Sequence, residues 1–162
     1  MARTKKRLLE PESTEAAAPK PGHWRKDKER EALERLATLL VREIDRILFD
    51  LDFRKDLLFR AWSRHRTRTP LLQTLRSHYY ELTFRELGKF PPDTYRLLDN
   101  FYRLLDAFIF YVTQTEDMPT SLALKFDSFL GDLKRHAQPA LTCLKEFCGE
   151  DDLKLEIPVF GD

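Results

Sequence analysis

Tyr95–Asp99 and Tyr102–Asp106 are two copies of one five-residue block, Tyr-Arg-Leu-Leu-Asp, that begin seven residues apart. Seven residues make about two turns of an α-helix, so each residue of the first block lies above its copy in the second. The apolar positions continue in the same register through Phe108 and Val112. A sustained heptad is typical of a long helix that packs against other helices. This stretch therefore predicts an all-α fold, and it indicates no chemistry.

Amphipathic segments lie on both sides of the heptad stretch. Apolar residues at spacings of three, four and seven predict helices, and Thr69-Pro70 is a helix start signal. Gly88 and Pro139 are expected to end helices. The sequence therefore predicts a largely antiparallel bundle of five or six helices. The expected helices cover about 24–52, 54–65, 70–88, 93–115, 120–138 and 140–149.

Three regions differ in composition. Residues 1–22 contain prolines and small polar residues with few large apolar groups, so we expect a disordered basic arm. Residues 23–149 form the helical bundle domain. Residues 150–162 are expected to form an acidic, extended tail, because apolar residues alternate with other residues there in a strand-like pattern. With no second strand to join, the tail either lies across the bundle or adds to the edge of a partner's sheet.

The charge of the chain is balanced overall but not locally. The net charge is +1 although charged residues make up 34% of the sequence, so no overall field favours nucleic acid or a membrane surface. Residues 54–78 contain seven basic groups and one acidic group, a net charge of +6. Residues 149–162 have a net charge of −4. A basic segment and an acidic segment are thus the candidate charged surfaces.

Targeting signals and cysteines indicate a compartment. No apolar stretch follows the basic start of the chain, so we expect no signal peptide. The longest apolar run, residues 107–112, is far shorter than the roughly 20 residues of a membrane span. Cys143 and Cys148, the only cysteines, lie about 140° apart around a helix and are not placed to bridge within it. We therefore expect reduced thiols in a soluble, cytoplasmic protein.

The Arg-rich segment 54–78 is the main candidate binding surface. Arginines that recur every four residues line one face of a helix, and guanidinium groups bind carboxylates and phosphates. A neighbouring tryptophan could stack on a base. Three interpretations stay open: a solvated helix face, a site for an acidic protein partner, and a site for nucleic acid or another polyanion. The candidate residues are Arg60, Trp62, Arg64, Arg66 and Arg68.

Arg60 and His65 also match a short enzyme motif. Their spacing, Arg-x4-His, resembles the motif of the HEPN-type helical ribonucleases, in which the pair lies at a dimer cleft and acts on a phosphodiester. The resemblance covers six residues, and Ala61 stands where that family favours a polar residue. It implies a ribonuclease with His65 as an essential residue, and this is the third hypothesis.

Two further segments are candidate protein-binding sites. Residues 108–112 make the heptad helix apolar on nearly all sides, so this helix is either central in the bundle or covered by a second protein. The alternating tail supplies a second set of apolar side chains. The candidate partner-binding residues are Phe110, Tyr111, Leu155, Ile157, Val159 and Phe160.

The sequence contains no pattern of a cofactor, a metal centre or an activated nucleophile. The five glycines are separated along the chain, which excludes a glycine-rich phosphate loop. No Glu-x-x-His pair of a di-iron bundle is present. We therefore expect a non-enzymatic protein–protein interaction module, such as an adaptor, a regulator or a small subunit of a larger assembly. A nucleic-acid-binding helical subunit that uses residues 54–78 is the alternative, and a homo-oligomer is compatible with either.

Overall fold

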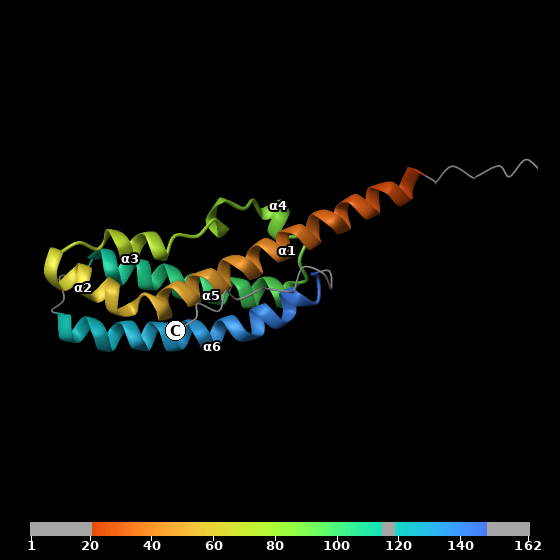
Figure 1. Cartoon of the computed structure of the whole chain (residues 1–162). Coiled ribbons are helices and arrows are strands. Elements are labelled where there is room, and N and C mark those ends of the chain that lie inside the picture. The colour runs from red at the N-terminus through yellow and green to blue at the C-terminus, as the bar shows by residue number, and fades with distance from the viewer. Residues whose placement is uncertain (1–20, 115–118, 149–162) are drawn as a thin grey trace, which may run out of the picture.

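The computed structural model describes residues 21–114 and 119–148, and within these residues it is all-helical, as the sequence predicted (Figure 1). Six α-helices and one short 3-10 helix make up this part of the chain. In order they are α1 (Pro21–Phe53), α2 (Lys55–His65), α3 (Thr69–Thr74), η1 (Tyr79–Glu81), α4 (Phe84–Leu87), α5 (Pro92–Gln114) and α6 (Pro119–Lys145). Residues 1–20 of the predicted N-terminal arm and the whole C-terminal tail, 150–162, lie outside the described residues, whereas Pro21 and Gly22 of the predicted arm belong to α1.

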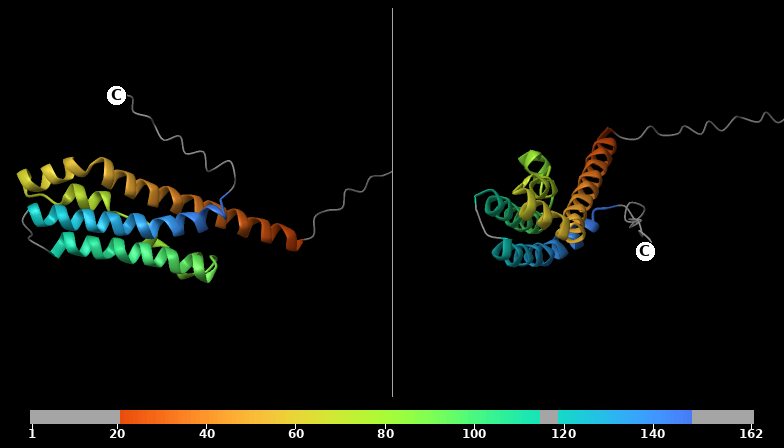
Figure 2. Two further views of the ribbon diagram at one scale, coloured as in Figure 1. Left: turned by 90° about the horizontal axis from the view of Figure 1, so that it is seen from below. Right: turned by 60° about the vertical axis from the view of Figure 1, so that its left-hand side comes forward.

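Helix α6 lies between the two other long helices. It packs against both α1 and α5, and it runs in the opposite direction to them, while α1 and α5 run in the same direction (Figures 1 and 2). The first turns of α1 extend beyond the rest of the bundle (Figure 2). The short helices α2 and α3 lie at the opposite end, where α2 packs against α1, α3 and α6.

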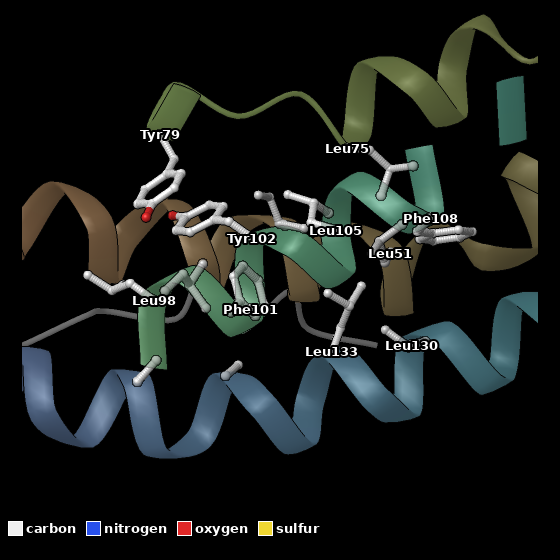
Figure 3. Packing of buried hydrophobic residues seen from close by; sticks show 14 of the residues in the cluster. Leu51, Leu75, Tyr79, Leu98, Phe101, Tyr102, Leu105, Phe108, Leu130 and Leu133 are labelled. Atoms are coloured by element: carbon white, nitrogen blue, oxygen red, sulfur yellow. The ribbon is translucent and has the colours of Figure 1, made fainter. Parts of the chain in front are cut away.

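The heptad stretch forms the buried face of α5, as its spacing predicted. Leu98, Phe101, Leu105, Phe108 and Val112 are each 0% exposed. Figure 3 shows the side chains of Phe101, Leu105 and Phe108 among those of α1 and α6. Because these apolar residues recur at three and four positions, all five lie on one stripe of the helix. This stripe anchors α5 to the bundle.

The prediction of one helix over residues 70–88 is wrong. Helix α3 ends at Thr74, and the chain continues through η1 to a separate short helix, α4. Thr83 begins α4 with a capping box, in which its hydroxyl accepts from the Glu86 backbone and the Glu86 carboxylate accepts from the Thr83 backbone. This Thr-x-x-Glu signal is present in the sequence and marks a new helix start. The loop before η1 also donates hydrogen bonds from the Ser77 hydroxyl and the His78 backbone to Glu43 of α1, and these tertiary contacts outweigh the helical spacing there.

The prediction that Pro139 ends a helix is also wrong. Helix α6 continues through Pro139 to Lys145. A proline inside a helix removes one backbone hydrogen bond and crowds the preceding turn. Pro139 is exposed, so water can satisfy the freed carbonyl, while Ala137 before it and Ala140 after it are 1% and 0% exposed in the core. Burial on both sides of the proline thus keeps the helix intact.

Two further features concern the helices and the cysteines of the described residues. None of the helices there combines the length and the apolar character that a membrane crossing requires. Cys143 and Cys148 are both free and partly buried.

Candidate interaction surface

Helix α2 is held firmly against the bundle by one face. Leu58 and Trp62 are 4% and 5% exposed, and they lie four residues apart, so they share one side of the helix. At the start of α2, the Lys55 ammonium forms an ion pair with Asp127 of α6. Phe59 packs edge-to-face on Phe126 of α6, with ring centroids 5.0 Å apart. The opposite face of α2 is thus presented to solvent on a rigid support.

Three of the predicted arginines lie on this solvent side. Arg60, Arg64 and Arg66 are exposed, and none of them forms an ion pair with another residue that the structure describes. Arg60 donates only to the carbonyl of Asp56, one turn back, at 3.3 Å. Arg60 and Arg64 share one helix face, and Arg66 follows at the C-terminal end of α2. We call these three residues the α2 arginine surface.

Arg66 has an unusual backbone conformation. Its φ is 52° and its ψ is 27°, the left-handed region, and its backbone N–H donates to the carbonyl of Trp62 to close the helix. It is the one residue with positive φ among those the structure describes. Glycine is favoured at this position because a Cβ atom is strained there. The chain therefore carries a long cationic side chain where the fold alone would favour glycine.

Arg66→Gly should stabilise the protein by roughly 0.5–1 kcal/mol, because glycine removes the strain of the left-handed conformation. Urea unfolding followed by circular dichroism measures the change. The control is Arg64→Gly, which lies within α2 and should cost about 1 kcal/mol. Equal destabilisation by both changes would contradict the assignment of strain to position 66.

Arg68 and Trp62, the two remaining candidates, face the protein rather than solvent. The Arg68 guanidinium lies over the Trp62 ring, 4.8 Å from its centroid. It also donates to the carbonyls of Val112 and Thr113, at 2.5 and 3.2 Å. Those carbonyls belong to the last turn of α5, where a cation complements the helix dipole. The pair therefore joins α2 to the end of α5, and Trp62 offers no exposed ring for stacking.

The Arg60–His65 pair of the ribonuclease-like motif lies within α2. Both residues are exposed. Five residues of helix separate them by about 140° around the axis, so the two side chains leave α2 on different faces. Within one chain, the motif does not place these groups together.

The predicted partner-binding residues of α5 differ in exposure. Phe110 is 67% exposed. Tyr111 is partly buried, and its ring lies 5.6 Å from that of Phe129 on α6. The tail residues Leu155, Ile157, Val159 and Phe160 lie outside the described residues.

Sequence reasoning missed an exposed aromatic pair on α1. Phe49 and Phe53 are 46% and 69% exposed, and their rings stack at 5.4 Å with an angle of 9°. The signal was available, because both residues fall off the apolar lines that contain Ile47 and Leu51. A hollow of about 370 Å³ lies beside them, lined also by Leu48, Asp52 and Lys134.

Sequence reasoning also missed a partly buried carboxylate between α1 and α5. Glu43 of α1 accepts from the Ser77 hydroxyl at 2.6 Å, the His78 backbone N–H at 2.9 Å and the Tyr102 hydroxyl at 3.1 Å. The His78 ring nitrogen Nδ1 lies 3.2 Å away. We call Glu43 and these partners the Glu43 cluster, and it fixes the loop between α3 and η1.

Hydrogen bonding controls the ionisation of the Glu43 cluster. Burial alone would raise the pKa of Glu43, but the hydrogen bonds from Ser77, His78 and Tyr102 outweigh it, so the pKa lies below its ordinary value. Burial raises the pKa of Tyr102, and the adjacent Glu43 charge raises it further. The cluster therefore holds an ionised carboxylate by several hydrogen bonds, an arrangement that stabilises structure. Within the described chain, no three His, Cys, Asp or Glu residues are grouped to hold a metal ion.

No protein-family model, curated protein or solved structure matches this sequence. The described residues form an all-α bundle in which α2 presents a basic face to solvent.

Proposed function

We propose that this protein is a non-enzymatic interaction module, and that the α2 arginine surface binds an acidic segment of a protein partner. The observation that carries the proposal is the exposure of Arg60, Arg64 and Arg66, which have no ion-pair partner among the described residues, on or directly after a helix whose other face packs into the core. A guanidinium group can form two parallel hydrogen bonds to one carboxylate, and its planar geometry reduces the rotamer entropy lost per hydrogen bond.

The surroundings favour a protein partner over a nucleic acid. Single-stranded nucleic acids are commonly bound by cationic grooves that also offer aromatic rings for base stacking. Trp62, the aromatic residue predicted for that role, is 5% exposed and covered by Arg68. The net charge of +1 also provides little long-range attraction for a polyanion. Nucleic-acid binding through residues 54–78 remains the alternative proposal.

Fluorescence anisotropy with two labelled probes distinguishes these classes. The probes are a 15-residue peptide of mixed Asp, Glu, Ser and Leu, and a single-stranded RNA of equal length. We expect the peptide to bind with a modest salt dependence. Tighter binding of the RNA, with affinity falling steeply as salt rises, would overturn the proposal in favour of the alternative.

The matched variants locate the binding site. Charge reversal at Arg60, Arg64 and Arg66 to glutamate should weaken peptide binding at least about tenfold. The control is reversal of three exposed arginines of α1, Arg30, Arg35 and Arg42, which changes the net charge equally. Equal loss in both triple variants would show that the peptide responds to overall charge and not to this surface.

A further inference from the structure

A hollow of about 250 Å³ opens between α2 and the first turns of α6, directly beside the α2 arginine surface. Its walls are mainly apolar, and Arg60 is itself one of the lining residues. The others are Phe59, Trp62, Ser63, Leu122 and Ala123. The packing of Phe59 on Phe126 and the Lys55–Asp127 ion pair hold the two walls together.

The size of this hollow limits what it can hold. Pockets for small-molecule ligands usually measure about 300–1,000 Å³ and enclose most of the ligand. This hollow lies below that range and is open to solvent on one side. It suits a single large side chain that projects from a peptide, which is how anchor residues enter pockets at protein interfaces.

Two other hollows lack the combination of an apolar wall and a free cation. In the hollow beside Phe49 and Phe53, Lys134 is paired with Asp52 at 3.0 Å. In a third hollow, next to α3, both Arg46 and Arg54 lie near the carboxylate of Asp50. At the α2–α6 hollow, Arg60 has no carboxylate partner among the described residues, so an incoming acidic group meets an unneutralised guanidinium.

We infer that the α2–α6 hollow receives one large aliphatic or aromatic side chain of the acidic partner segment, while carboxylates beside that side chain bind Arg60 and Arg64. This inference rests on the proposed function and specifies its partner: an acidic peptide with an apolar anchor residue. Phe59, Leu122 and Ala123 then determine specificity by contact with the anchor, and the arginines supply affinity and orientation. A peptide that is only acidic would bind the arginines and leave the apolar hollow empty.

Two labelled peptides test the inference on the whole 162-residue chain. Both consist of Asp, Glu and Ser, and they differ only at the central residue, which is Leu in one and Ala in the other. Burial of a Leu side chain in the hollow should make the Leu peptide bind about tenfold more tightly than the Ala peptide.

Filling the hollow should remove this preference. In Ala123→Phe the new ring occupies the hollow, so the two peptides should bind equally. Ser63→Phe fills it from the α2 wall and should act in the same way, which keeps the test valid if one variant fails to fold. Leu124→Phe is the control, because Leu124 is 73% exposed and does not line the hollow. This control should keep the preference for the Leu peptide.

The outcomes separate the inference from the proposed function. Equal binding of both peptides to the unmodified protein, with loss of both in the triple arginine variant, would overturn the anchor and leave the acidic-partner proposal standing. If neither peptide binds the unmodified protein, both the inference and the proposed function are overturned. A Leu preference that persists in Ala123→Phe and Ser63→Phe would place the anchor elsewhere and overturn the inference.

Discussion

Phe108→Ala should lower the free energy of unfolding by about 3–5 kcal/mol. Phe108 is 0% exposed, its ring stacks on Phe129 at 4.7 Å, and it packs edge-to-face on Phe126 at 5.6 Å. Truncation removes buried apolar surface and leaves a cavity between α5 and α6, the main contact of the bundle. Urea unfolding at constant temperature measures the loss.

Phe110→Ala is the matched control for this prediction. Phe110 lies two residues further along α5 and is 67% exposed, so its truncation should change the free energy of unfolding by no more than about 0.5 kcal/mol. Similar losses for both variants would contradict the assignment of the heptad face to the core. If Phe110→Ala leaves the stability unchanged, the fold does not need this exposed ring, which can then contact a partner.

Glu43→Ala should cost about 3 kcal/mol, the second largest effect. The change leaves the hydroxyls of Ser77 and Tyr102 and the backbone N–H of His78 without their acceptor. Loss of the acceptor for the buried Tyr102 hydroxyl costs about 1–3 kcal/mol, and loss of each bond from the more exposed Ser77 and His78 costs about 0.5–1.5 kcal/mol. For a chain of this length the midpoint of thermal unfolding should fall by about 6–12 °C. Glu31→Ala, an exposed carboxylate on the same helix, should be nearly neutral.

The pH dependence of this effect has a defined sign. The pKa of Glu43 in the folded protein lies below its ordinary value of 4.5, so its contribution is complete above that value and is lost as the pH falls through the folded pKa. The difference in stability between the unmodified protein and Glu43→Ala should therefore be constant near pH 7 and shrink below about pH 4.5. A difference that grows on acidification would contradict the role of the ionised carboxylate.

The long helices could be predicted from the sequence because their signals are local. The heptad of α5 and the apolar lines of α1 repeat at short spacing, and burial of Ile44 and Leu51 follows directly from that repetition. The same reasoning placed α2 at 54–65, within one residue of its observed start. Periodicity decides such segments because one apolar face must be buried.

The segment between α3 and α5 could not be predicted because long-range partners decide its structure. Ser77 and His78 bind Glu43, which lies more than 30 residues earlier, and Tyr80 donates to the carbonyl of Tyr102. No local spacing reveals these contacts. Pro139 was misjudged for a similar reason, since tertiary burial of its neighbours outweighs its local preference.

The candidate surface was predicted in part. The basic character of residues 54–78 follows from composition, but exposure does not. Trp62 and Arg68 lie in the same segment as the α2 arginine surface, but in the folded protein they contact each other and join α2 to the end of α5. Arg60, Arg64 and Arg66 are exposed instead and have no ion-pair partner among the described residues. The hollow beside Arg60 is also lined by Leu122 and Ala123 of α6, which lie about 60 residues further along the chain. No local pattern in the sequence shows that these two segments meet.

The most direct test of the account is capture of native partners by the tagged 162-residue chain from a nuclease-treated lysate. The unmodified protein is compared with the triple variant Arg60→Glu, Arg64→Glu and Arg66→Glu, and with the control triple variant on α1. The account predicts a stoichiometric protein partner that the unmodified protein and the control retain, that the α2 variant loses, and that the acidic Leu peptide displaces. The same partners on the α2 variant, or partners that disappear from the unmodified protein after nuclease treatment, would contradict it.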